Sequence, residues 1–405
     1  MQDSALEPAR PQASTQTDGL VPWRAIAVLI AVLSVFALNG GFMFPALTFV
    51  LDARGFSATV VGAVGSAGAI GYIVGSAMAP FIAAAFGLRR TAVVALVTTA
   101  CMIFSFAVVP PVLAWYPMRF VHGIATTILF VCGESALIAI APRDVRGRIL
   151  GAYTAINSAF FAAGSGVVGV LGFNGLWPYL LVAVVIGLLA IPMASLGKIT
   201  PDSPATPWRH LLRSVATIPM LLIVICAWGW IDGATLNLWG VYAIKSGVSP
   251  RYAAWLLSLG AIGNIFLQFP IGWLADHLPR RWVLAGLAAA GCASSLCLMA
   301  LDFSGQPMMV NLLLLGSVGF GTFTVALITL GDVLTGTALV AANAAFGLCW
   351  GIGDFAGAGV TGALMDVVGP NAFPLALAVG FLVQCAAVIL LPLRSGVAGP
   401  TQQAA

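Results

Sequence analysis

Four ionisable side chains interrupt long apolar stretches of the sequence: Arg119, Glu134, Asp232 and Asp354. A charged group in lipid costs several kcal/mol to insert unless it faces partner groups or water. A carboxyl group in a cavity of low dielectric can take up and release a proton near neutral pH. We therefore expect these residues to face the interior of a helical bundle and to bind a solute or couple its movement to protons.

Arg119 and Glu134 lie on one expected helix, fifteen residues apart. At about 100° per residue they project within about 60° of one face, but they are about 22 Å apart along the helix. They cannot pair with each other, so each needs a partner of its own. A tie between helices that only orders the bundle is the alternative role for either residue.

Asp232 and Asp354 each follow a tryptophan by one helical turn. On two expected helices a carboxylate shares one face with large aromatic or polar side chains: Trp228, Asp232 and Trp239 on the first, and Asn343, Trp350 and Asp354 on the second. Such faces suit a solute cavity better than a lipid contact. The alternative is an acid that is permanently paired with Arg119 or capped by backbone groups.

Further polar side chains inside apolar stretches are candidates for lining the same cavity: Asn39, His122, Asn157, Asn264, Gln268 and Gln384. A single buried amide often only ties two helices together, and His122 has the alternative role of a hydrogen-bonded interior histidine. Asn39 is the strongest of these candidates because it matches Asp232 in an internal repeat.

The helices that must position these residues are transmembrane helices. Of the 405 residues 60% are hydrophobic and 7% are charged, whereas soluble domains have about 25% charged residues. Spans of roughly 20 apolar residues are needed to cross a bilayer. Breaks at glycine, proline and charge clusters predict twelve of them: 24–50, 58–84, 91–110, 112–141, 148–173, 176–196, 215–244, 252–276, 281–301, 307–331, 337–366 and 371–393. The fold class is therefore an all-α membrane protein.

An internal repeat divides the spans into two sets of six. Leu38-Asn39-Gly40 and Gly55-Phe56-Ser57 are echoed by Ile231-Asp232-Gly233 and Gly247-Val248-Ser249, at separations of 192 or 193 residues. We expect a disordered tail (1–22), a first six-helix bundle (23–196), a linker (197–214), a second bundle (215–394) and a tail (395–405). Lys and Arg gather in one set of alternate loops, while the opposite set has only Arg54, Lys245 and Arg251. This bias places both termini in the cytoplasm.

The loop after the eighth span carries a family motif. Residues 272–281 read Gly-Trp-Leu-Ala-Asp-His-Leu-Pro-Arg-Arg, which resembles the signature loop of the major facilitator superfamily. We expect Gly272, Asp276, Arg280 and Arg281, with Arg146 of the first half, to form a conformational latch. A merely basic cytoplasmic loop is the alternative. The matching loop of the first half has Ala79 at the acidic position, which weakens the case for a symmetric latch.

The fourth span extends the resemblance. Arg119 followed by Gly123 resembles the fourth-helix motif that this superfamily connects with proton coupling, and His122 replaces a polar residue often found before that glycine. With Glu134-Ser135-Ala136-Leu137, Gly75-Ser76 and Ala79-Pro80, the pattern is similar to the YcaD-like branch, over residues 25–393. The resemblance implies two pseudo-symmetric six-helix bundles that rock about a central site.

We therefore expect a secondary transporter for a small organic solute in a bacterial cytoplasmic membrane, proton-coupled, with export favoured over import. The expected partners are lipid, solute and protons, and the expected state is a monomer. The alternatives are a facilitated uniporter or uptake carrier, and a non-transporting sensor or assembly partner with a carrier fold. Neither an enzyme, nor a cofactor or metal, nor a nucleic-acid partner is expected, since the seven cysteines are unpaired in spacing and no phosphate-binding loop is present.

Overall fold

The computed structural model describes residues 23–142, 146–196, 218–334 and 336–391. Its helices follow one another along the chain: α1 (Trp23–Ala53), α2 (Ala58–Phe86), α3 (Leu88–Val108), α4 (Val112–Ile140), α5 (Arg146–Leu171), α6 (Trp177–Leu188), α7 (Ala190–Ala194), α9 (Pro219–Lys245), α10 (Pro250–His277), α11 (Arg280–Cys297), α12 (Gln306–Val333), α13 (Gly336–Val368) and α14 (Ala372–Leu390). The all-α prediction is confirmed for this part of the chain.

α6 and α7 form a single span, Trp177–Ala194, with a break at Leu189. Pro192 explains the break, because it has no N–H to donate to the carbonyl four residues earlier. Counted this way, the described residues contain twelve spans, of which eleven are long and apolar enough to cross a membrane. α11 is the exception: it has 18 residues and begins with two arginines.

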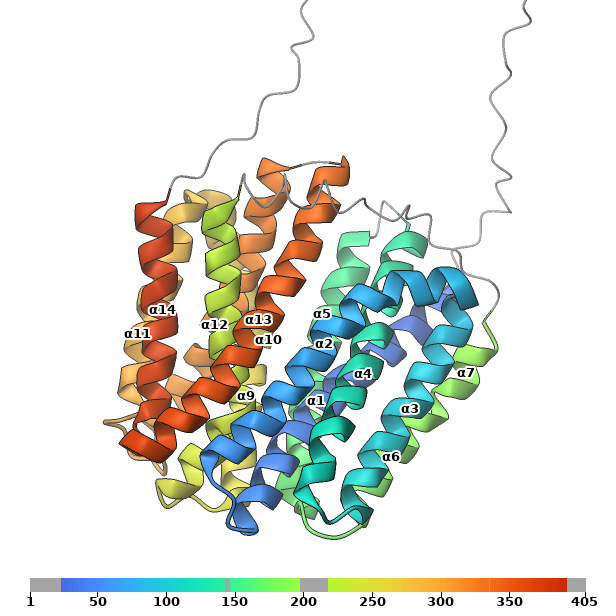
Figure 1. Cartoon of the computed structure of the whole chain (residues 1–405). Coiled ribbons are helices and arrows are strands. Elements are labelled where there is room, and N and C mark those ends of the chain that lie inside the picture. The colour runs from blue at the N-terminus through green and yellow to red at the C-terminus, as the bar shows by residue number, and fades with distance from the viewer. Residues whose placement is uncertain (1–22, 143–145, 197–217, 335, 392–405) are drawn as a thin grey trace, which may run out of the picture.

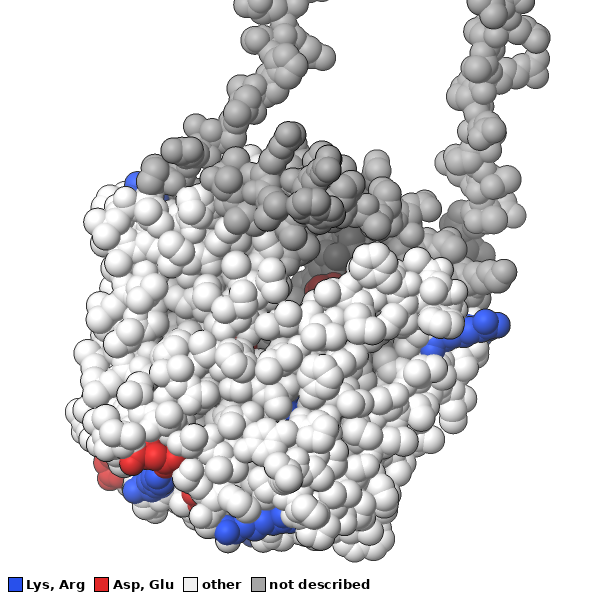
Figure 2. Space-filling model, viewed as in Figure 1, with Lys and Arg blue, Asp and Glu red and all other residues white. Residues whose placement is uncertain are grey.

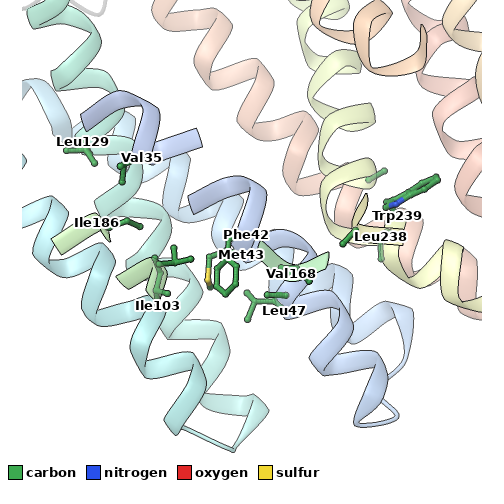
Figure 3. Close-up of a cluster of buried hydrophobic side chains, with 14 of the residues drawn as sticks. Val35, Phe42, Met43, Leu47, Ile103, Leu129, Val168, Ile186, Leu238 and Trp239 are labelled. Atoms are coloured by element: carbon green, nitrogen blue, oxygen red, sulfur yellow. The ribbon is translucent and has the colours of Figure 1, made fainter. Parts of the chain in front are cut away.

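The helices form two halves, α1 to α7 and α9 to α14, which lie side by side (Figure 1). Within each half, helices from equivalent places in the repeat pack together: α2 on α4 and α1 on α5, and α10 on α12 and α9 on α13. Figure 3 shows part of the N-terminal core, where α1 side chains such as Phe42 and Met43 approach Ile103 of α3 and Ile186 of α6. The expected linker (197–214) and both tails lie outside the described residues.

The repeat noticed in the sequence is a turn followed by a helix cap. Gly55 and Gly247 have φ of 78° and 86°, a conformation that glycine adopts without strain. Two residues later, Ser57 and Ser249 each accept a hydrogen bond at 3.4 Å from the backbone N–H three residues on. Both turns lie at the same end of the molecule, which we call the closed end. The opposite end, where α1 begins and α14 ends, is the open end (Figure 1).

The two halves are joined from mid-depth to the closed end. Thr48 of α1 donates to the carbonyl of Asn237 on α9 at 2.8 Å, and Ser66 of α2 donates to that of Phe355 on α13 at 2.8 Å. A third hydrogen bond between the halves, from Asn264 of α10 to Ser158 of α5, lies at mid-depth. Figure 2 shows a hollow between the halves near the open end, with acidic atoms visible inside it.

Candidate functional site

The N-terminal half carries a buried polar relay at mid-depth. Arg119 Nη1 lies 2.9 Å from His122 Nδ1, and His122 Nε2 lies 2.9 Å from Asn39 Oδ1. All three side chains are at most 2% exposed. A guanidinium only donates, so His122 Nδ1 is the acceptor and Nε2–H donates to Asn39. These contacts fix His122 as the neutral tautomer that carries its proton on Nε2. Asn39 thus orients His122, and His122 orients Arg119.

Arg119 is held by aromatic rings and has no carboxylate partner. Its guanidinium carbon lies 4.8 Å from the centre of the Phe44 ring and 6.0 Å from that of Tyr72. No described carboxylate lies within 4 Å, and its Nε has no hydrogen-bond partner. A Cβ at Gly68 would lie 2.8 Å from that Nε, so the glycine makes room for the side chain. A small cavity between α1, α2, α4 and α9 borders Arg119 and Asn237.

The C-terminal half carries two carboxylates at the same depth. Trp350 Nε1 donates to Asp232 Oδ2 at 3.2 Å. Asp354 is 2% exposed, and its Oδ1 is buried without a hydrogen-bond partner. Asp354 is close enough to Asp232 for repulsion and close enough to Arg119 for attraction. Neither acid is in an ion pair with any described residue, so the alternative of a permanent Arg119 pair does not hold in this conformation.

Two aromatic rings connect the relay to the carboxylates. Tyr72 of α2 lies between the halves, and its ring centroid is 6.0 Å from that of Trp350 on α13. Sequence reasoning missed Tyr72, whose neighbours in the chain are small or apolar. The arrangement at mid-depth is therefore one cation in the N-terminal half and two acids in the C-terminal half, separated by Tyr72 and Trp350.

A second line of polar contacts crosses the interface between α5 and α10. Asn264 Nδ2 donates to Ser158 Oγ at 3.0 Å, Gln268 Nε2 donates to Asn264 Oδ1, and Thr324 of α12 donates to Gln268 Oε1 at 3.1 Å. Asn264 and Gln268 thus tie α5, α10 and α12 together, and Gln268 is half-buried rather than sealed. Ser158 and Thr324 were not singled out in the sequence.

Glu134 and Asn157 lie toward the open end of the N-terminal half. Glu134 is half-buried on α4 and interacts electrostatically with Tyr153 of α5, which also contacts Asn157. The buried Oδ1 of Asn157 has no hydrogen-bond partner. Glu134 and Arg119 are not brought together, in keeping with their separation along α4.

The remaining candidates contribute mainly to packing. Trp228 packs on Phe320, with ring centroids 5.6 Å apart. Trp239 donates to the carbonyl of Ala253 at 2.9 Å and lies in an aromatic cluster within the C-terminal half. Gln384 is fully buried and donates to the carbonyl of Val224 at 3.2 Å, which ties α14 to α9. Asn343 is exposed.

The expected latch residues contact their own half in this conformation. Arg280 Nε donates to Asp332 at the end of α12, and Arg280 Nη1 lies 3.8 Å from Asp276. Arg281 donates to the carbonyls of Val388 and Ile389 and so caps the C-terminus of α14. Gly272 has open space around it, and the side chain of Arg146 lies outside what the structure describes. Asp332 was missed in the sequence, although it is an acid at the end of a span.

Among the described residues no group of His, Cys, Asp or Glu could hold a metal ion. The model of the Major Facilitator Superfamily matches the chain over residues 27–358 and 232–404. Relatives include the uncharacterized MFS-type transporters YfkF of Bacillus subtilis, 23% identical over 82% of this chain and 86% of its own, and YcaD of Escherichia fergusonii, 26% identical over 77% and 81%.

Solved structures with the same fold include the nucleoside transporter NupG, with a TM-score of 0.73 and 16% identity over 90% of this chain and 98% of its own. Another is a bacterial homologue of the human lysosomal transporter Spinster in an inward-facing, unoccupied conformation. Its TM-score is 0.69, with 12% identity over 92% of this chain and 95% of its own. At these identities the likeness concerns the fold alone.

Proposed function

The chain belongs to the Major Facilitator Superfamily, and we propose that it exports a small organic solute across the cytoplasmic membrane of a bacterium by proton-coupled alternating access. It is a multi-pass membrane transporter rather than an enzyme. The coupling ion, the direction of transport and the class of solute are the parts that we propose.

The observation that carries the proposal is the pair of mid-depth acids without a counter-ion. A buried carboxylate that has no cationic partner is costly, and a bound proton removes its charge. Asp354 interacts with Arg119 across the interface between the halves, so a rocking motion of the halves changes the field that acts on this acid. Proton binding and conformation are thereby linked, because each state favours a different charge on Asp354.

Alternating access is supported by where hydrogen bonds join the halves and by where a hollow lies between them. Cross-half hydrogen bonds reach from mid-depth to the closed end, and a hollow lies near the open end (Figure 2). The loops rich in Lys and Arg predict that the open end faces the cytoplasm. With this orientation the conformation is inward-facing. We also propose that the protein works as a monomer.

We infer the class of solute from the side chains that lie at the interface between the halves. Carboxylates beside tryptophan favour cationic or amphipathic solutes through charge and cation–π contacts. Export of such solutes follows as the favoured direction. Nucleosides also belong among the compounds to test, because NupG shares the fold and is a nucleoside transporter.

The coupling can be tested before the solute is known. Protein reconstituted on a solid-supported membrane should give a transient current after a pH jump, as protons bind in the membrane. Asp232→Asn and Asp354→Asn should each reduce this charge displacement severalfold, and the double variant should abolish it. Asp302→Asn removes a carboxylate from an exposed loop and should leave the current unchanged. Full currents in the double variant would refute proton coupling through these acids.

The solute and the sensor alternative can be tested by thermal stabilisation. A panel of nucleosides, amino acids, sugars and cationic drugs is screened for compounds that raise the melting temperature, since a ligand of the folded site stabilises it. Each such compound is then assayed for counterflow in proteoliposomes. Binding without counterflow would favour a sensor that keeps the carrier fold, whereas counterflow unaffected by pH would favour a uniporter.

A further inference from the structure

An ionic contact at the closed end joins the two halves. Asp366, in the last turn of α13, accepts hydrogen bonds from three donors at the start of α2: Ala58 N–H at 3.0 Å, Thr59 N–H at 2.7 Å and Thr59 Oγ1–H at 2.6 Å. The first N–H groups of a helix have no partner within it and carry partial positive charge. The carboxylate of one half therefore caps a helix of the other.

Lys245 adds a second cross-half charge interaction to this contact. Its Nζ lies 3.8 Å from Asp366 Oδ1, and it also interacts electrostatically with Asp52 of α1. Lys245 ends α9 in the C-terminal half, whereas Asp52 is close to the end of α1 in the N-terminal half. The lysine thus lies between an acid of its own half and an acid of the other half.

The opposite side of the interface carries a contact of the reverse polarity. Arg251, in the first turn of α10, donates through Nη2 to the carbonyl of Val170 at 3.2 Å. Val170 lies in the last turn of α5, where carbonyls have no partner within the helix and the helix dipole is negative. Here a cation of the C-terminal half caps a helix of the N-terminal half. Arg251 is the repeat counterpart of Thr59, at a separation of 192 residues.

We propose that Asp366, Lys245 and Arg251 form a closed-end latch, in which each charge caps a helix of the other half or bridges to one of its acids. The latch rests on the proposed alternating access, since it must break when the closed end opens. The side chains of Asp366 and Lys245 are 25% and 37% exposed, so water can replace the partners when the halves separate. The latch therefore sets how often the closed end opens without making that opening prohibitive.

Hydrogen exchange measured by mass spectrometry on the full chain in lipid nanodiscs tests the latch without a solute. In Asp366→Asn we expect exchange at the start of α2 and the end of α13 to rise about tenfold, because the charged part of the helix-capping interaction is lost. Arg251→Gln should raise exchange at the end of α5 and the start of α10 by a smaller factor, because it makes a single hydrogen bond. Asp366→Glu should restore most of the protection.

Asp302→Asn is the matched control, because the Asp302 side chain accepts hydrogen bonds from Ser304 in its own exposed loop and lies outside the latch. Exchange at the Asp366 and Arg251 contacts should stay as in the wild type. Exchange within α3 and α11 reports the integrity of each half. Wild-type protection at α2 and α13 in Asp366→Asn would overturn the latch, as would a rise that extends equally to α3 and α11 and is not reversed by Asp366→Glu. If the wild type showed the latch protection but gave no proton-driven current, the proposed coupling would be wrong and the latch would stand.

Discussion

The α2–α4 crossing of the N-terminal half and the α10–α12 crossing of the C-terminal half are built alike. A Cβ on Gly71 would overlap the backbone of α4 near Gly123, and a Cβ on Gly263 would overlap the backbone of α12. Gly123 has Gly316 as its repeat counterpart, and Gly316 meets Gly260 of α10. In lipid, where helices gain little from the hydrophobic effect, such small residues allow the backbone contact that holds a crossing together.

The polar side chains beside these crossings differ between the halves. Where α4 has Arg119 and His122, the repeat positions of α12 hold Leu312 and Leu315, both buried. The reverse exchange occurs on the first helix of each half, where Asn39 corresponds to Asp232. The shared glycines thus specify the helix packing, while the exchanged polar residues place a cation on one side of the interface and acids on the other.

The largest test of this comparison makes the N-terminal half resemble the C-terminal half. Arg119→Leu should reduce proton-driven currents by roughly tenfold or more, because it removes the positive charge whose field acts on Asp354 across the interface. Solid-supported membrane currents measure the loss.

Leu312→Met is the matched control, since it changes the equivalent buried position of α12 at nearly constant volume. Its currents should stay within about twofold of the wild type. Currents near the wild-type level in Arg119→Leu would mean that the difference in charge between the halves has no role in coupling.

The next test concerns the glycines at the helix crossings that both halves share. Gly71→Ala and Gly263→Ala should each lower the free energy of unfolding by about 1–3 kcal/mol, because the added methyl group forces two helices apart. Thermal melting in one detergent measures both variants. Gly166→Ala is the control: its Cβ would meet no atom within 4 Å, so we expect no loss of stability. A loss confined to one half would contradict the equivalence of the two crossings.

The next prediction concerns the two mid-depth acids, for which we expect a smaller change in the free energy of unfolding. Asp354→Asn should raise the free energy of unfolding by about 1–2 kcal/mol, because it removes a buried charge whose Oδ1 has no partner. Asp232→Asn should raise it less, since Trp350 already donates to Asp232. Melting of both variants beside Asp302→Asn measures the order. Equal destabilisation by both substitutions would show that the acids are structural.

Helix positions and the division into halves follow from local signals, and these were predicted. Apolar length specifies the spans, and the Gly55 and Gly247 turns with their serine caps mark where a helix of each half begins. The interior placement of Arg119 and Asp354 also follows, because lipid penalises charge at any other place. α11 carries the apolar signal most weakly, because its arginines and serines lower its mean hydropathy.

The partners of these residues could not be predicted, because they come from helices far apart in the sequence. Tyr72 reaches Arg119 and Trp350 only once α2 packs on α4 and α13, and Asp366 meets Ala58 across about 300 residues. Trp239 shares a helical face with Asp232, yet it lies two turns nearer the closed end, where an aromatic cluster surrounds it. Helical periodicity predicts which residues share a face of a helix. It does not predict how far along the helix that face lines a cavity.

The smallest expected effect distinguishes the two capped turns. At the start of α10, Pro250 has no N–H and Ser249 caps the next free donors, so Ser249→Ala should cost about 1 kcal/mol. At the start of α2, Asp366 already accepts from Ala58 and Thr59. Ser57→Ala should therefore cost less, and its cost should rise toward that of Ser249→Ala when Asp366→Asn is added. Thermal melting of this double-mutant cycle gives the coupling energy between Ser57 and Asp366. If the costs of Ser57→Ala and Asp366→Asn add strictly, the Ser57 cap and the Asp366 carboxylate act independently. The starts of α2 and α10 would then differ in their contacts but not in the energy of their serine caps.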